Sequence, residues 1–220
     1  MWIYYKYIYG MLHYHEFAYQ YCHTNTTIYY LMMNRDAGTP LRETLEALTD
    51  LVRSGKVRYI GCSNYNAWQI VESLRVSEKY NLLKFITVQP QYSLIARQIE
   101  LSIVEVCQRD NIGILPWSPL CGGWLSGKYK KGQNEPEKNS RVHWAESANW
   151  EQTNFKAQNN ERTWNILAEL ELIAKELNIT VAGMCTENSM ISHINTVLTC
   201  RLYLCKCSCV TTLVYAATSN

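Results

Sequence analysis

The chain has 220 residues, of which 18% are charged, and its formal net charge is +2. This length allows one domain with a sizeable core but is short for a complete (β/α)₈ barrel, which needs about 250 residues. Because the net charge is small and the basic residues are scattered, the composition argues against a nucleic-acid or anionic membrane surface as partner. No apolar run reaches the roughly 20 residues that a membrane span requires, so we expect no membrane insertion.

The cysteine count is nine, an odd number. The first ten residues, MWIYYKYIYG, lack the basic start, smooth apolar run and cleavage site of a signal peptide. We therefore expect a cytoplasmic protein with reduced thiols. Four cysteines crowd near the C-terminus, at Cys200, Cys205, Cys207 and Cys209. Paired zinc ligands are usually separated by about two to four residues, so this spacing argues against a metal site.

The composition and periodicity of the sequence change twice along the chain. Residues 1–27 are rich in aromatic side chains and hold neither a helical nor an alternating period. Residues 36–182 show clear periodicity, with caps and turn signals between the periodic segments. Residues 183–220 form a Cys-rich tail that matches nothing before it. We therefore expect one structured domain over 28–182, flanked by two segments without an assignment.

The first clear elements are a helix and a strand. Thr39 suits an N-cap and Pro40 the first helical position. Apolar residues then recur at helical spacing, at Leu41, Leu45, Leu48 and Val52, and Gly55 is a natural C-terminal stop. The β-branched and aromatic run over 57–62 follows at once and predicts a strand. A weaker strand is expected upstream, over 28–33.

Further elements follow in the same alternation. Asn66 is expected to cap a second helix with Trp68, Val71 and Leu74 on its inner face. A strand over 85–89, a helix over 100–110 and a strand over 112–117 come next. After a long polar segment over 128–158, a final helix is expected over 160–177. Its predicted inward residues are Leu167, Leu170, Ala174 and Leu177.

The three clearest strands begin at Val57, Phe85 and Ile112, which are 28 and 27 residues apart. A strand, a helix and two loops need about that length, so the period predicts a parallel α/β sheet, either open or closed into a barrel. Ligands of such sheets bind at the carboxyl ends of the strands. That rule selects residues 63–64, 89–91 and 117–119 as candidate site positions. The alternative on spacing alone is a capping turn at 63–64 and a core role for Trp117.

Three ordered segments, GKVRYIGCSNYNAWQI, TVQPQYSLIAR and ILPWSPLCGGWLSGKY, resemble consecutive segments of the aldo-keto reductases. The likeness is greatest to the branch with bacterial reductases and potassium-channel β-subunits, and it covers about two thirds of the chain. The resemblance implies a (β/α)₈ TIM-type barrel, of which this chain holds about four of the eight βα units. It also implies NADP(H) as cofactor and small-molecule carbonyl compounds as substrates, reduced by hydride transfer.

The same resemblance assigns cofactor-binding roles to ten residues. Ser63, Asn64 and Gln89 match residues that hydrogen-bond the nicotinamide carboxamide, and Trp117 matches the aromatic ring that stacks on the nicotinamide. The pyrophosphate-wrapping loop of the family corresponds to Ser118, Pro119, Leu120 and Cys121. Lys128 and Arg141 match basic residues near the phosphates, where charge-assisted hydrogen bonds form. The alternative for Lys128 and Arg141 is a solvated loop charge.

The family's catalytic residues have no match. The family uses a Tyr proton donor, a neighbouring Lys and Asp, and a His that polarises the carbonyl. Nothing in residues 1–27 resembles the segments that carry the first three. If Asp36 is the family's Asp before the Thr-Pro helix start, Met33 stands at the His position, and His23 lies ten residues too early. Met cannot donate a proton to a carbonyl oxygen. We assign no catalytic residue and expect the chain by itself to be inactive.

Three interpretations follow. The chain is a non-catalytic piece of an NADP(H)-dependent carbonyl reductase, or a cofactor-binding regulatory module like a channel β-subunit, or an unstable truncated product. After ITVAGM, the family's eighth strand and its 2′-phosphate motif do not follow, so a weak preference for NADPH over NADH is expected. Four parallel strands would also leave two open edges and an uncovered apolar face.

Overall fold

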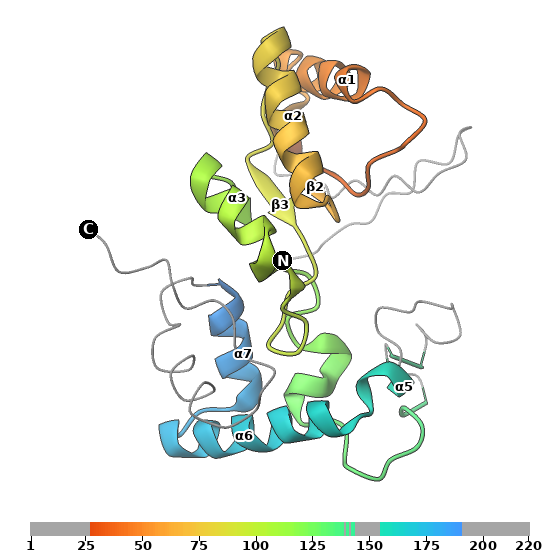
Figure 1. Cartoon of the computed structure of the whole chain (residues 1–220), viewed down its shortest axis with the longest axis vertical. Coiled ribbons are helices and arrows are strands. Elements are labelled where there is room, and N and C mark those ends of the chain that lie inside the picture. The colour runs from red at the N-terminus through yellow and green to blue at the C-terminus, as the bar shows by residue number, and fades with distance from the viewer. Residues whose placement is uncertain (1–26, 139, 141, 144–154, 191–220) are drawn as a thin grey trace. The chain divides into compact units, whose positions relative to one another are not determined.

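The computed structural model describes residues 27–138, 140, 142–143 and 155–190. It divides into two compact units (Figure 1). We call the first the sheet unit; it holds the residues up to Pro90 together with Ile99–Leu115. We call the second the helical unit; it holds Gln91–Gln98 and the residues from Pro116 onward. The expected segment 1–27 lies outside the described residues except for Thr27, as do residues 191–220 of the expected tail.

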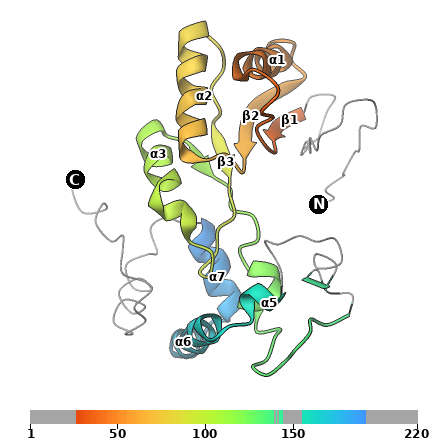
Figure 2. The same ribbon diagram turned by 45° about the vertical axis from the view of Figure 1, so that its right-hand side comes forward.

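The sheet unit contains four parallel strands in the order β1-β2-β3-β4. Their bounds are Thr27–Met32, Val57–Ser63, Thr87–Gln89 and Gly113–Ile114. The order follows the chain, and helices connect the strands, as Figure 2 shows. The predicted α/β class and the parallel pairing of four strands are confirmed. The strands expected over 85–89 and 112–117 are shorter than predicted.

The register of the sheet aligns the carboxyl ends of its first three strands. Met32 lies opposite Cys62 in the β1–β2 ladder. Ser63, the last residue of β2, lies opposite Gln89, the last residue of β3. Parallel strands therefore present β2 and β3 residues at a shared edge, where the strand-end rule predicts ligand contacts.

Helix α1 spans Leu41–Arg53 and packs the predicted residues Leu41, Leu45 and Leu48 into the core. Gly55 has φ +73°, and the helix ends just before it, as expected. The predicted cap is wrong. Pro40 occupies the N-cap position, and Thr39 instead donates its hydroxyl hydrogen bond to Asp36 Oδ2 at 2.6 Å. Thr39 is thus part of the turn that precedes the helix.

Helix α2 spans Ala67–Tyr80 and begins with a capping box formed by Asn66 and Gln69. The predicted cap at Asn66 is confirmed, but the predicted inner face is wrong at Trp68, which is 59% exposed. The helix instead buries Ile70 and two serines, Ser73 and Ser77. Ser73 donates to the Gln69 carbonyl at 2.7 Å, so a polar residue is accommodated on the buried face without losing hydrogen bonds.

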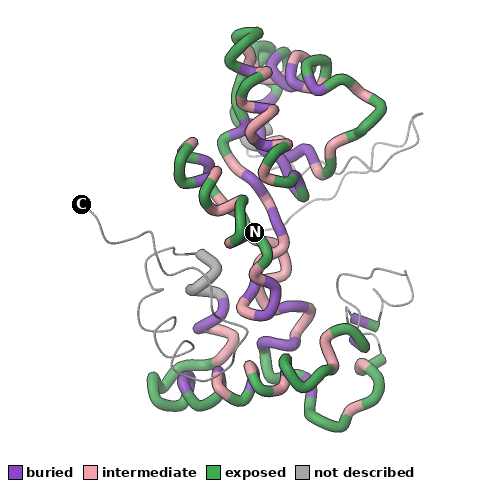
Figure 3. Tube along the Cα trace, viewed as in Figure 1, coloured by how far each residue is buried: buried purple, intermediate pink, exposed green. Residues whose placement is uncertain are grey.

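Between β3 and β4 lie a short 3₁₀ helix, η1, over Gln98–Leu101 and helix α3 over Ile103–Asp110. The predicted single helix over 100–110 is therefore split. The core of the sheet unit joins the inner faces of the helices to the strands, and buried residues follow the strands in Figure 3. Its members include Leu45, Leu48, Ile60, Cys62, Tyr65, Ile70, Phe85, Val88 and Cys107.

The helical unit contains η2 over Cys121–Ser126, α5 over Phe155–Gln158, α6 over Glu161–Leu177 and α7 over Val181–Met190. Asn160 caps α6 by accepting a hydrogen bond from Thr163 N at 3.0 Å. Leu167, Leu170 and Ala174 are buried as predicted, but Leu177 is 47% exposed. Leu177 is the last helical residue, before Asn178 turns left-handed with φ +54°. The expected domain boundary at residue 182 falls inside α7.

An aromatic cluster forms the centre of the helical unit. Trp124 and Phe155 are almost fully buried, with ring centroids 5.1 Å apart. Trp164 packs edge-on against Trp124 at 5.3 Å, and its indole Nε1 donates to Asn159 Oδ1 at 2.9 Å. Such pairs bury large apolar surfaces in specific geometries, so they fix η2 against α5 and α6.

Candidate functional site

Ser63 and Gln89 meet at the carboxyl ends of β2 and β3. The Ser63 hydroxyl donates a hydrogen bond to the Gln89 main-chain carbonyl at 2.7 Å, and the same carbonyl accepts from Asn64 N at 3.2 Å. Ser63 is fully buried, Asn64 is exposed and Gln89 is half-buried. The Ser63 hydroxyl therefore links the ends of the two strands. The side-chain amides of Asn64 and Gln89 lie nearer the surface.

Asn64 adopts a left-handed backbone conformation with φ +56°. Asn tolerates this region better than most residues, because its short polar side chain bonds locally. Its side-chain Nδ2 donates to Asn34 Oδ1 at 3.3 Å. This contact joins the loop after β1 to the loop after β2. Three polar residues from neighbouring strand ends therefore lie together: Asn34, Asn64 and Gln89.

Sequence reasoning missed Asn34 and the adjacent Arg35. Arg35 Nη1 forms an ion pair of 2.9 Å with Glu72 Oε2, and its guanidinium carbon lies 5.3 Å from the centre of the Trp68 ring. No motif marks these residues, and the strand before them carried the weakest signal.

Met33 follows the last residue of β1, Met32, and is half-buried. It stands at the same strand edge as Asn34 and Asn64. A thioether is a weak acceptor and carries no proton to donate. The described residues at the end of β1 therefore offer an amide and a guanidinium but no imidazole.

Trp117 belongs to the helical unit. It forms an isolated parallel bridge with Gln91, and Tyr92 N donates to the Trp117 carbonyl at 3.3 Å. Its side chain is half-buried, so the structure places it neither in the core nor free in solvent. The following loop turns sharply: Ser118 has φ +54° and Cys121 has φ +49°. Pro119 and Leu120 between them are half-buried.

Cys121 closes this loop and is almost completely buried. Its N–H donates to the Ser118 carbonyl at 2.8 Å, which tightens the turn. Burial raises the pKa of the Cys121 thiol to about 11, opposed in part by a hydrogen bond with Ser93. At neutral pH the thiol is protonated and unreactive, so Cys121 contributes shape to the loop rather than a nucleophile.

Two basic residues were expected near the phosphates of a cofactor. Lys128 is exposed, and its Nζ lies 3.2 Å from Glu137 Oε2. An exposed ion pair of this kind contributes about 0–1 kcal/mol, so Lys128 can exchange Glu137 for another anion at little cost. Arg141 lies outside the described residues.

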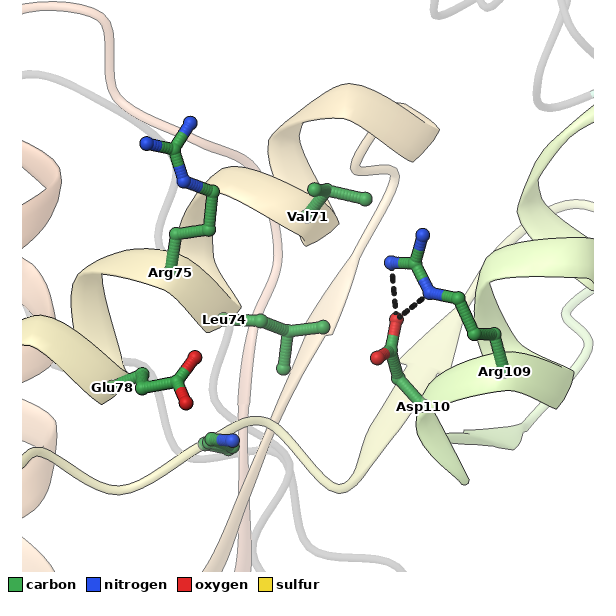
Figure 4. Close-up of a pocket in the computed structure, with 7 residues that line it drawn as sticks. Val71, Leu74, Arg75, Glu78, Arg109 and Asp110 are labelled. Atoms are coloured by element: carbon green, nitrogen blue, oxygen red, sulfur yellow. Dashed lines mark hydrogen bonds and ion pairs between the residues drawn. The ribbon is translucent and has the colours of Figure 1, made fainter.

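A shallow groove between α2 and α3 lies at the other end of the strands. It is lined by Val71, Leu74, Arg75, Glu78, Lys84, Arg109 and Asp110 (Figure 4). Arg109 and Asp110 form a fork of hydrogen bonds, of 3.1 and 2.6 Å, at the end of α3. Lys84 precedes β3 and Asp110 precedes β4, so this groove opens at the amino ends of the strands. Strand topology therefore separates it from Ser63, Asn64 and Gln89.

The model of the "Aldo/keto reductase family" matches residues 14–188 of this chain. The chain belongs to the aldo/keto reductase family. Members are oxidoreductases that typically depend on NAD(P)H and act on small carbonyl compounds. The matched range begins before, and ends after, the domain expected from the sequence over 28–182. No helix in the described part of this family member is long and apolar enough to cross a membrane.

Relatives of known sequence agree with that assignment. A Schizosaccharomyces pombe protein named among the aryl-alcohol dehydrogenases is 33% identical over 155 residues, covering 70% of this chain and 41% of the relative. The oxidoreductase YrpG of Bacillus subtilis is 40% identical over 102 residues, or 46% of this chain and 31% of the relative. The Tas protein of Escherichia coli is 40% identical over 92 residues, which cover 42% of this chain and 27% of the relative.

A solved structure shows the same fold. The glycerol dehydrogenase of Gluconobacter oxydans matches with a TM-score of 0.60 and 24% identity, over 73% of this chain and 45% of that protein. The four parallel strands alternating with helices thus correspond to part of an aldo-keto reductase barrel. The chain spans less than half the length of these relatives.

Proposed function

We propose that this chain binds the nicotinamide end of NADP(H) at the carboxyl ends of β2 and β3, as part of a carbonyl reductase. The observation that carries the proposal is the meeting of Ser63, Asn64 and Gln89 at one strand edge. A carboxamide has donors on its nitrogen and an acceptor on its oxygen. The exposed amide of Asn64 and the half-buried amide of Gln89 suit both halves of that group, so the residues present fit the cofactor's reactive end.

Each residue has a distinct role in this proposal. Asn64 and Gln89 bind the carboxamide and orient the nicotinamide ring. The buried Ser63 hydroxyl holds the Gln89 main chain, which keeps the two amides in register. The family resemblance assigns Trp117 the stacking role, for which a tryptophan offers a large rigid surface. The nicotinamide supplies the hydride when it is bound, and the chain's own residues set which face of the ring is open.

In this proposal the loop after Trp117 binds the phosphates of the cofactor. The turn of Ser118, Pro119, Leu120 and Cys121 wraps the pyrophosphate in this proposal. Lys128 and Arg141 add positive charge, and Lys128 releases Glu137 when it engages a phosphate. The cost of that exchange is small because both side chains are at least one third exposed.

A second function is favoured by Met33: a cofactor-binding module without turnover. The resemblance expects the carbonyl-polarising His where Met33 stands, and Met donates no hydrogen bond. General acid catalysis contributes about 10²–10⁴-fold to rate, so the loss of polarising and protonating groups removes most of the chemistry. We therefore propose that this chain by itself binds the cofactor and does not reduce carbonyl compounds.

The proposed location is the cytoplasm. Cys62, Cys107, Cys121 and Cys185 are free thiols, in keeping with a reducing compartment.

The test of turnover is the oxidation of NADPH by the purified chain with an aromatic aldehyde, compared with a full-length bacterial relative such as Tas. The proposal expects no oxidation above the background without enzyme, in a sample that binds NADPH. Oxidation at a rate near that of the relative would overturn the non-catalytic part of the proposal. A sample that neither binds nor turns over the cofactor would overturn the whole of it.

A further inference from the structure

Two consecutive residues after β1 contact the segment that follows β2. Asn34 Oδ1 accepts a hydrogen bond from Asn64 Nδ2 at 3.3 Å. Arg35 Nη1 pairs with Glu72 Oε2 at 2.9 Å, and its guanidinium lies 5.3 Å from the centre of the Trp68 ring. Asn64 lies in the loop, and Trp68 and Glu72 lie in the first two turns of α2. The segment over 64–72 is thus held at its start by Asn34 and along its helix by Arg35.

Asn64 is the residue of this segment whose amide belongs to the candidate site. Its φ of +56° is in the left-handed region, which Asn tolerates, so the backbone does not by itself fix the direction of the side chain. The side chain is exposed, so burial does not fix its torsions. The contact with Asn34 is long for a hydrogen bond and depends on where the loop after β1 lies. An anchor for that loop therefore contributes to the direction of the Asn64 amide.

Arg35 has the geometry of such an anchor. Its side chain is only 23% exposed although both of its partners lie on the surface of α2. The Nε atom is buried and has no hydrogen-bond partner in the part of the chain that the structure describes. A planar guanidinium binds a carboxylate through its edge and an aromatic ring through its face at the same time. Trp68 has no core role, since it is 59% exposed, so its contact with Arg35 accounts for its position.

We propose that Arg35 is a positioning residue for nicotinamide recognition. By anchoring residues 34–35 on α2, it allows Asn34 to hold the Asn64 amide in the direction that meets the nicotinamide carboxamide. The binding part of this inference rests on the proposed function, whereas the contact from Arg35 through Asn34 to Asn64 does not. The two parts are therefore tested by separate measurements on the same samples.

The first measurement follows the side-chain amide signals of Asn64 in the chain labelled with ¹⁵N-asparagine, assigned by their loss in Asn64→Asp. Arg35→Met removes the charge and the planar fork but keeps an apolar stem against Trp68. The Asn64 amide protons should then move toward the values of an Asn side chain that makes no intramolecular hydrogen bond, and they should exchange faster with water. Arg35→Lys keeps the charge for Glu72 and Trp68 and should restore part of the change.

Arg42→Met is the matched control. Arg42 also pairs with a glutamate, Glu46 at 2.7 Å, and also lies over an aromatic ring, Tyr80 at 4.2 Å. It contacts the last residue of α2 rather than the first turn. Its loss should leave the Asn64 signals unchanged. If Arg35→Met does not fold, Glu72→Gln weakens the same anchor more gently and should shift the Asn64 signals in the same direction.

The second measurement titrates the same variants with reduced nicotinamide mononucleotide. Arg35→Met should weaken its binding about threefold to tenfold, the range expected from losing one ion pair and one cation–π contact. Arg42→Met should leave it unchanged. Asn64 signals that do not respond to Arg35→Met would overturn the anchor. Signals that respond while the wild-type chain fails to bind the mononucleotide would uphold the anchor and overturn the binding role.

Discussion

The Ser63 hydroxyl donates a hydrogen bond of 2.7 Å to the Gln89 main-chain carbonyl, joining the last residues of two parallel strands. Ser63 is fully buried, and the same carbonyl also accepts from Asn64 N. Three candidate site residues are therefore coupled through one oxygen atom. A change at Ser63 alters both the stability of the sheet edge and the placement of the two amides.

Ser63→Ala should lower the free energy of unfolding by about 1 kcal/mol, because one buried hydrogen bond is lost and no charge is exposed. Urea unfolding followed by circular dichroism measures this. Ser54→Ala is the control, since the Ser54 hydroxyl also donates to a carbonyl, that of Leu51 at 3.0 Å, but is exposed. A cost at Ser63 no larger than the cost at Ser54 would show that the strand-edge bond contributes little.

Gly122→Ala should destabilise the helical unit more than Gly127→Ala. Both glycines have positive φ, +66° and +75°. A Cβ at Gly122 would lie 2.8 Å from Val142 Cγ2, whereas a Cβ at Gly127 meets nothing within 4 Å. Gly127→Ala therefore reports backbone strain alone, and Gly122→Ala adds a clash worth about 1–3 kcal/mol. Thermal unfolding of the two variants measures the difference.

The clash has its own control. In a double-mutant cycle, Val142→Ala should cost less in the Gly122→Ala background than in the wild type, because the smaller side chain makes room for the new Cβ. Additive costs would mean that the two positions do not touch.

The Cys121 thiol should make the chain less stable in alkali. Its pKa is raised from 9.0 to about 11 by burial, so the folded state keeps the proton that the unfolded state loses. The stabilisation is complete below pH 9 and is lost as the pH rises from about 9 to about 11. By pH 10 the loss is about 1 kcal/mol. Cys121→Ala should show a smaller fall in urea midpoint between pH 8 and pH 10 than the wild type. Equal falls would contradict the prediction.

Removing the cap of α6 should weaken that helix. Asn160 Oδ1 accepts from Thr163 N at 3.0 Å, so Asn160→Ala should cost about 1 kcal/mol. Asn160→Ser keeps a capping oxygen and should cost much less. Helical ellipticity and the unfolding midpoint measure both variants. A serine variant as unstable as the alanine variant would show that the cap is not the cause.

Local signals in the sequence predicted much of the fold. The leucine period of α1, the cap at Asn66 and the 27–28 residue spacing of strands each reflect a rule that acts over a few residues. The errors lie where tertiary contacts decide. Trp68 fits an inner helical face by spacing, but α2 buries Ile70 and two serines instead and leaves Trp68 exposed. Thr39 suits an N-cap by type, but Asp36 takes its hydroxyl.

The candidate site was likewise predicted in part. The strand-end rule predicted that Ser63 and Gln89 come together, because parallel strands in register share an edge. It did not predict that Ser63 is buried and donates to the main chain, since hydroxyl direction depends on the neighbouring strand. Asn34 and Arg35 were missed because their partners, Asn64 and Glu72, lie 30 and 37 residues away. Contacts at such separations leave no local pattern.

The most direct test is a titration of the chain with NADPH, followed by energy transfer from tryptophan to the bound nicotinamide. Wild type, Asn64→Ala and Trp117→Ala are compared with Trp68→Ala, which removes an exposed tryptophan outside the proposed contact residues. We predict saturable binding that weakens about tenfold or more in Trp117→Ala and less in Asn64→Ala, because stacking involves the larger surface. Trp68→Ala should weaken it less than Trp117→Ala. Absence of saturable binding, or tight binding that survives both Trp117→Ala and Asn64→Ala, would contradict the proposed site.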